Sequence, residues 1–188
     1  MSEVKRFNKL LIPENTTLLI IDIQERILPV MNNFQRVVDN TLKLIKGFKV
    51  IVLPIYFTEQ YPIGLGPTLT SITDALGDLK PFDKMSFSCS GAADLFEEFK
   101  KKNLSQIVVC GIESHVCIQQ TVLDLLENGF QVNVAADAVS SRKEIDYHTS
   151  LERMRYHGAE VTTTESILFE LLNVCGTSQF KEVSKIVK

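Results

Sequence analysis

The sequence has few residues of the kinds that bind metal ions or form disulfide frameworks. It contains three histidines, no tryptophan and four cysteines among 188 residues. The cysteines, Cys89, Cys110, Cys117 and Cys175, form no C-x-x-C pair and no spacing typical of a zinc site or a disulfide framework. Four free thiols fit a reducing compartment, so we expect a cytoplasmic protein.

Long hydrophobic runs and blocks of one charge are also missing. The run "LLIIDI" is interrupted by Asp22 and is far shorter than the roughly 20 apolar residues of a membrane span. The apolar patch at 10–12 is too short for the core of a signal peptide. The net charge is −3 and the basic residues are scattered, which argues against nucleic-acid and membrane partners.

What the sequence does contain is a regular alternation of two patterns. Short β-rich apolar runs occupy 16–22, 49–57, 105–112, 130–137 and 159–164, and longer stretches with helical spacing separate them. Nearly continuous apolar runs are typical of parallel strands that are covered on both faces. We therefore predict an α/β fold of three layers: a doubly wound, mostly parallel sheet of about six strands with helices on both faces.

The length and the absence of a linker predict a single domain over 1–188, with a core at about 16–165 and a helical tail at 166–188. An apolar stripe in the tail either closes the chain's own core or covers a neighbouring molecule. The segment 58–70 reads as a long irregular loop, a feature that is usually functional, with an ordinary surface excursion as the alternative.

Ligands of such sheets bind beyond the carboxyl ends of the strands. This rule selects Asp22, the segment 59–61, the turn "GIESHVC" and Asp137, for which a cap of the following turn is the simpler role. The sequence has neither G-x-G-x-x-G after a strand nor G-x-x-x-x-G-K-[ST], so it carries no common nucleotide motif. A phospho-acceptor module is disfavoured because Ile21 and Ile23 flank Asp22 where an acidic pair is needed.

The turn "GIESHVCIQQT" is the sharpest feature. If Ser114 caps a helix, Cys117 lies in its first turn, where free N–H groups and the helix dipole favour a thiolate and lower its pKa. The same N–H groups suit an oxyanion formed when the thiolate attacks a carbonyl. Ser141 and Glu144 similarly read as a capping box for a later helix, in which Gly158 follows the last turn.

A nucleophilic cysteine needs a base, and no histidine is well placed for that role. His115 points from another side of the helix, whereas His148 and His157 lie on a later helix. The base is then Asp22, with Lys84 as the cation that holds the two charges together. The alternative reading is a turn-capping Asp, a surface Lys and a core Cys.

Four segments together resemble a known superfamily. "LLIIDIQ", Lys84, "GIESHVCIQQT" and "AADAVSSR" occur in the order and spacing of the isochorismatase-like cysteine hydrolases, which include nicotinamidases and N-carbamoylsarcosine amidases. The resemblance covers about 16–165 and implies a catalytic triad of Asp22, Lys84 and Cys117. It also implies a cis peptide between Ile112 and Glu113, with the N–H groups of Glu113 and Cys117 forming an oxyanion hole.

The sequence departs from some members of that superfamily. Nicotinamidases carry metal-binding histidines after the second strand, where this chain has "YFTEQYPIGLGPT", so we expect no metal and no cofactor. Isochorismatases that cleave a vinyl ether lack the nucleophilic cysteine, which argues against that reaction. The segment "TEQYPIGLGPT" resembles the isochorismatase-domain-containing branch, which implies that Glu59, Gln60 and Tyr61 approach the pocket mouth; loop structure or a subunit contact is the alternative.

Three further residues are candidates for substrate binding: Gln24, Phe87 and His115. For Gln24 the simpler role is to orient neighbouring site residues or to form a turn, and for His115 it is an exposed position in the first helical turn. The leading hypothesis is a cysteine-dependent hydrolase that cleaves a small amide or carbamoyl substrate through a thioester. The alternative is a hydrolase fold with little turnover that serves binding or assembly, and a thiol redox enzyme is disfavoured because no resolving cysteine is close in sequence. The resemblance also implies a homo-oligomer.

Overall fold

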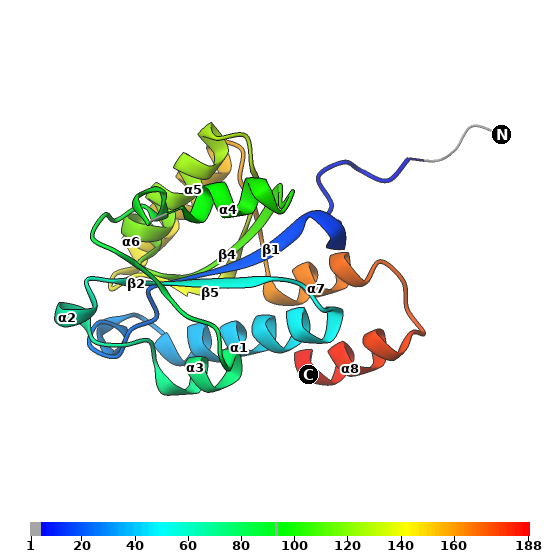
Figure 1. The fold of residues 1–188 in the computed structure, drawn as a ribbon, viewed down its shortest axis with the longest axis horizontal. Helices are drawn as coiled ribbons and strands as arrows, with labels where there is room; N and C mark the ends of the chain where they lie inside the picture. The colour runs from blue at the N-terminus through cyan, green and yellow to red at the C-terminus, as the bar shows by residue number, and fades with distance from the viewer. Residues whose placement is uncertain (1–4, 93) are drawn as a thin grey trace.

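The computed structural model describes residues 5–92 and 94–188 (Figure 1). Its centre is one six-stranded sheet in the order β3-β2-β1-β4-β5-β6. All five strand pairings are parallel, which confirms the predicted α/β fold. The strands are β1 (Thr16–Ile21), β2 (Ile55–Gln60), β3 (Phe82–Lys84), β4 (Gln106–Ile112), β5 (Gln131–Ser140) and β6 (Glu160–Thr162).

Helices cover both faces of the sheet (Figure 1). One face carries α1 (Phe34–Ile51), α3 (Thr70–Leu76), α7 (Thr164–Leu172) and α8 (Ser178–Val187). The other carries α4 (Leu95–Lys101), α5 (Gln119–Glu127) and α6 (Glu144–Tyr156). A short α2 (Pro62–Leu65) follows β2, a π-helix (Ser114–Ile118) joins β4 to α5, and 3₁₀ turns occupy Pro13–Asn15, Leu28–Val30 and Cys89–Gly91.

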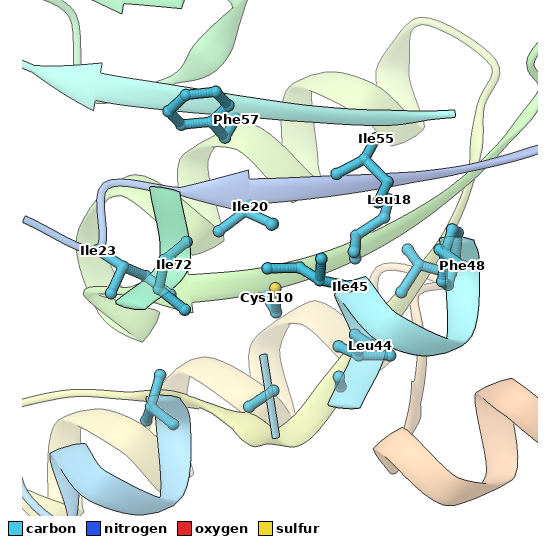
Figure 2. Close-up of a cluster of buried hydrophobic side chains, with 14 of the residues drawn as sticks. Leu18, Ile20, Ile23, Leu44, Ile45, Phe48, Ile55, Phe57, Ile72 and Cys110 are labelled. Atoms are coloured by element: carbon cyan, nitrogen blue, oxygen red, sulfur yellow. The ribbon is translucent and has the colours of Figure 1, made fainter. Parts of the chain in front are cut away.

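The central strand β1 contributes to two cores. Leu18 and Ile20 pack on the α1 side, while Leu19 and Ile21 pack on the α4–α5 side. Because both faces are covered, the strand reads as a continuous apolar run and not as an alternating one. Figure 2 shows the α1-side core, in which side chains of β1, β2 and α1 meet.

The apolar run at 49–57 was predicted as strand, but residues 49–51 are the end of α1 and only 55–57 are strand. The last turn of α1 runs through Ile51, and Val52 closes it in the left-handed region with φ of 63°. Pro54 then favours extended backbone before it, so β2 begins only at Ile55. The segment 58–70, predicted as irregular, contains the end of β2, all of α2 and the start of α3.

The C-terminal tail closes the core of its own chain. The helices α7 and α8 pack against α1 (Figure 1). Ile167, Leu168 and Leu171 of α7 are buried, and so is Val183 of α8. Of the two roles that the apolar stripe allowed, the structure supports the first. Within the described ranges, no helix has both the length and the hydropathy to cross a membrane.

Candidate active site

The site begins with Asp22, the residue directly after β1. Its backbone is in the left-handed region with φ of 53°, and the residue is 2% exposed. The hydroxyl of Thr58, on the adjacent strand β2, donates to Oδ1 at 2.7 Å, and Nζ of Lys84 donates to Oδ2 at 2.7 Å. The carboxylate is thus fully buried, paired with a cation and held on both oxygens.

Lys84 is the last residue of β3, and its side chain is completely buried. Besides Asp22, its ammonium donates to Oε1 of Gln60 at 2.8 Å and to the carbonyl oxygens of Ser86 at 3.2 Å and Phe87 at 3.0 Å. A buried charge needs such partners because it has lost its water. The lysine is therefore fixed behind Asp22 and is not among the residues that line the cavity described next.

Cys117 lies in the π-helix between β4 and α5 and is 7% exposed. It shares a cavity of about 80 Å³ with Asp22. The structure thus brings together Asp22, Lys84 and Cys117 from three separate parts of the chain. The full set of lining residues is Asp22, Ile27, Gln60, Leu65, Phe87, Ile112, Glu113, Val116 and Cys117.

The electrostatics of this cluster differ from the sequence-based expectation. Burial raises the pKa of Asp22, and the charge and hydrogen bond of Lys84 oppose that rise, as do hydrogen bonds from Thr58 and Cys117. Burial also raises the pKa of Cys117, and the Asp22 carboxylate raises it further against the effect of Lys84. The predicted lowering of the Cys117 pKa is wrong because loss of solvent and a neighbouring carboxylate outweigh the effect of the helix start.

The predicted serine caps are also wrong. The Ser114 side chain caps no N–H group; its hydroxyl is buried and has no hydrogen-bond partner among the described residues. The Ser141 hydroxyl contacts Nδ1 of His115 at 2.9 Å, and α6 begins without a side-chain cap. Gly158 does follow the end of α6, with φ of 106°.

His115 and Asp137 both lie outside the cavity lining. Besides its contact with Ser141, His115 has Nε2 3.9 Å from a carboxylate oxygen of Asp146 on α6. Asp137 accepts from the backbone N–H and the hydroxyl of Thr164, at 2.8 and 3.0 Å, and so caps the start of α7.

Glu113 follows a cis peptide bond with Ile112. Its side chain is 8% exposed, and its carboxylate accepts from Nε of Arg142 at 2.9 Å. Sequence reasoning missed this arginine as a site residue. It lies in the segment "AADAVSSR", but no spacing rule pairs it with a glutamate 29 positions earlier.

Two candidate binding residues prove to hold the loop around the cavity. Gln24 donates through Nε2 to the carbonyl oxygens of Gln60 at 3.0 Å and Gly66 at 2.7 Å, and its Oε1 accepts from the N–H of Gln60. Glu59 accepts from the N–H and the hydroxyl of Thr68, both at 2.7 Å. Neither lines the cavity.

Of the remaining candidates, Gln60 and Phe87 line the cavity, and Tyr61 is a 45% exposed residue next to them that does not. Sequence reasoning missed three apolar lining residues, Ile27, Leu65 and Val116.

A second set of polar contacts fixes the segment that follows Lys84. The hydroxyls of Ser88 and Ser90 donate to the same oxygen of Asp124 on α5, at 2.5 and 2.8 Å. The N–H of Cys89 donates to the Thr121 hydroxyl at 2.9 Å, and burial raises the pKa of Cys89 to about 12. Within residues 5–92 and 94–188, no group of three or more His, Cys, Asp or Glu side chains is arranged to hold a metal ion.

A parallel six-stranded sheet with helices on both faces, and with this cluster at its carboxyl edge, is the fold of the isochorismatase family of hydrolases. The Isochorismatase domain family matches residues 16–166, and the chain belongs to this family. Isochorismatase domain-containing protein 2A of Mus musculus is 39% identical over 178 residues, which are 95% of this chain and 85% of that protein.

Solved structures agree. The chain superposes on the MAR1 ribonuclease of Caenorhabditis elegans with a TM-score of 0.87 and 35% identity, over 94% of this chain and 91% of the other. It superposes on the YcaC gene product of Escherichia coli, described as an octameric hydrolase of unknown specificity, with a TM-score of 0.84 and 23% identity, over 91% and 85% of the two chains. The second likeness concerns the fold alone.

Proposed function

We propose that this protein is a cysteine-dependent hydrolase that cleaves the C–N bond of a small amide or carbamoyl compound. The observation that carries the proposal is the single cavity that joins the Cys117 thiol to Asp22, a carboxylate held by Lys84 at 2.7 Å. Acyl transfer to a thiol requires a nucleophile and an adjacent base, and here the buried cation holds the base in place.

In the first half of the reaction, Asp22 accepts the thiol proton as the Cys117 sulfur bonds to the substrate carbonyl carbon. The carbonyl π-electrons move to oxygen, and the N–H groups of Glu113 and Cys117 stabilise the oxyanion. As the tetrahedral intermediate collapses, the C–N bond breaks and Asp22 gives the proton to the leaving amine. The product of this half is an amine and a thioester on Cys117.

In the second half, water attacks the thioester while Asp22 accepts one of its protons. The second tetrahedral intermediate expels the Cys117 sulfur, which regains the proton from Asp22, and the carboxylic acid leaves. Atoms balance as amide plus water giving acid plus amine. The Lys84 ammonium does not exchange protons in this scheme; it balances the negative charge shared by Asp22 and Cys117.

The pKa directions support proton transfer during the attack and not before it. Because burial raises the pKa of Asp22, its carboxylate is a stronger base than an ordinary one. Because the pKa of Cys117 is also raised, Cys117 rests as a thiol. The thiolate then exists only while the new S–C bond forms.

The test incubates the purified protein with a panel of small amides and carbamoyl compounds and measures the amine that is released. Cys117→Ala is expected to lower the rate of hydrolysis by at least about 10³-fold, because the nucleophile is lost. Cys175→Ala is the matched control, since Cys175 is an exposed thiol away from the cavity, and it is expected to retain full activity. Activity that survives Cys117→Ala excludes the mechanism.

Two other outcomes are covered by the same panel. Since one relative is described as a ribonuclease, the panel includes a short RNA; cleavage of RNA without amide hydrolysis would replace the proposed substrate class. A protein that binds amides and turns none over would support the alternative, a hydrolase fold used for binding or assembly.

We also propose a homo-oligomer in the cytoplasm. Large apolar side chains are exposed on two adjoining segments beside the cavity, Tyr61 on one and Met85 and Phe87 on the other. The segments are joined by a hydrogen bond from the N–H of Tyr61 to the carbonyl of Lys84. Exposed apolar clusters of this kind mark contact sites, and light scattering on the purified protein measures the assembly.

A further inference from the structure

The wall of the cavity beyond Asp22 and Cys117 is largely apolar. Five of the nine lining residues have hydrocarbon side chains, and they come from four separate segments. They are Ile27, Leu65, Phe87, Ile112 and Val116. The remaining two lining residues, Gln60 and Glu113, are polar, so the state of their side chains decides what the cavity offers to a ligand.

Both polar side chains are already engaged within the protein. Oε1 of Gln60 accepts from Lys84 at 2.8 Å, and its Nε2 donates to the Met85 carbonyl at 2.8 Å. The Glu113 carboxylate is neutralised by Arg142, with Nε 2.9 Å from Oε2. These two side chains therefore offer a ligand no uncompensated charge, because the Gln60 amide is neutral and the Glu113 carboxylate is paired with Arg142.

The charges of the reacting cluster are engaged in the same way. The two oxygens of Asp22 accept from Thr58 and Lys84, each at 2.7 Å. The Lys84 ammonium has four oxygen partners, including the carbonyls of Ser86 and Phe87. A substrate ammonium would therefore find both carboxylates of the cavity lining, Asp22 and Glu113, already paired with a cation, and a substrate carboxylate would lie near Asp22 with no cation among the lining residues.

From this we infer that the acyl group of the substrate is small, uncharged and apolar. The inference rests on the proposed function and names its substrate class. A charged acyl group would lose its water in this cavity and gain no counter-charge, which weakens binding in both the ground and the transition state. The size limit follows from the volume of about 80 Å³, several-fold below the roughly 300–1,000 Å³ of pockets for drug-sized ligands.

The first experiment measures the charge preference of the cavity without turnover. Wild-type protein is alkylated with iodoacetamide or with iodoacetate, which differ in charge and little in size, and the rates at individual cysteines are followed by peptide mass spectrometry. The exposed thiol of Cys175 reports the intrinsic reactivity of the two reagents in the same molecule.

The ratio of the neutral to the anionic rate is expected to be at least about tenfold higher at Cys117 than at Cys175, since a charge left unpaired in the cavity costs at least that factor. Equal ratios at the two cysteines, or a preference of Cys117 for iodoacetate, would overturn the inference and leave the nucleophile in place. Failure of Cys117 to react with either reagent would contradict the proposed function and, with it, the inference.

The second experiment measures turnover of isosteric amides. Butyramide and 3-aminopropanamide have the same number of non-hydrogen atoms and differ by one positive charge, and isovaleramide and malonamate differ in the same way by one negative charge. The neutral member of each pair is expected to have a kcat/KM roughly 10- to 100-fold higher. Equal or higher values for the charged amides would overturn the inference while supporting amide hydrolysis.

The size limit has its own variant and control on α2. Leu65 lines the cavity, whereas Ile63 on the same helix is 84% exposed and does not. Leu65→Ala is expected to raise the kcat/KM of hexanamide relative to butyramide by roughly tenfold, and Ile63→Ala is expected to leave that ratio unchanged. An unchanged ratio in Leu65→Ala, or the same change in both variants, would contradict the placement of this wall.

Discussion

Replacement of Lys84 by methionine removes the only cation bound to Asp22 among the described residues and keeps most of the side-chain volume. The ammonium is fully buried and donates to four oxygens, while the carboxylate that it would leave behind is 2% exposed. Removing one partner of a buried ion pair costs about 3–5 kcal/mol because the other charge stays buried without compensation. We expect Lys84→Met to lower the free energy of unfolding by about that amount near neutral pH.

The stability lost in Lys84→Met depends on pH, and the direction of that dependence follows from the pKa of Asp22. Burial raises that pKa and Lys84 lowers it, so Lys84→Met raises it further above the value of about 3.9 in the unfolded chain. A group with a raised folded pKa contributes stability below its unfolded pKa and loses it as the pH rises through the folded pKa. The free energy of unfolding that Lys84→Met loses relative to wild type is therefore largest near pH 7.5 and smaller at about pH 4.5.

Urea unfolding of both proteins at the two pH values measures this difference. Lys100→Met is the control, because Lys100 forms an exposed pair with Glu97 at 3.1 Å and its loss is expected to change stability by no more than about 0.5 kcal/mol. Asp22→Asn combined with Lys84→Met removes the stranded charge and is expected to recover part of the stability. A deficit below about 1 kcal/mol, or one that is the same at both pH values, would refute the reasoning.

Three further predictions concern the base, the sheet and the oxyanion hole. The kcat/KM for amide hydrolysis should fall on the acid side with a midpoint above about 3.9, since Asp22 must be ionised and burial raises its pKa; a midpoint at or below that value would contradict its role as buried base. Gly111→Ala should destabilise the fold by more than about 3 kcal/mol in thermal unfolding, because its φ is 120° and a Cβ would overlap the backbone of β1. Gly158→Ala is the control, since its φ is 106° but its Cβ would meet open space, and it should cost only the roughly 1–2 kcal/mol of the unfavourable backbone conformation. Arg142→Gln should lower kcat/KM about tenfold by leaving the Glu113 carboxylate without its cation near the developing oxyanion, and adding Glu113→Gln should restore much of it; equal losses in both variants would argue against a charge effect.

The layers of the fold were predictable because strands buried on both faces have a recognisable sequence pattern. β1, β4 and β5 read as nearly continuous apolar runs, and the positions just beyond them include Asp22 and the turn with Cys117. β3 has only three residues and a half-exposed surface, so no run marks it. Lys84 at its end was proposed as the cation beside Asp22 and Cys117, a role that the resemblance to a superfamily also implies, although its segment shows no strand pattern.

Two parts of the site were beyond local rules. The position of Cys117 near a helix start predicted a lowered pKa, because nearby N–H groups favour a thiolate. The loss of solvent that raises the pKa instead is visible only in the packed structure. The apolar wall depends on how α2 folds back beside the sheet, so Leu65 carries no signal in its neighbouring residues. Gln24 and Glu59 were candidates for substrate contact, and their actual partners are backbone groups of the loop and Thr68.

The most direct test of the account is the search for a thioester on Cys117. Wild-type protein is mixed with a small neutral amide, quenched in acid within the first turnover and digested, and the peptide that contains Cys117 is weighed by mass spectrometry. The account predicts that this peptide gains the mass of the acyl group and that Cys175 does not. Amide hydrolysis at an undiminished rate in Cys117→Ala, or an acyl group trapped on any other residue, would contradict it.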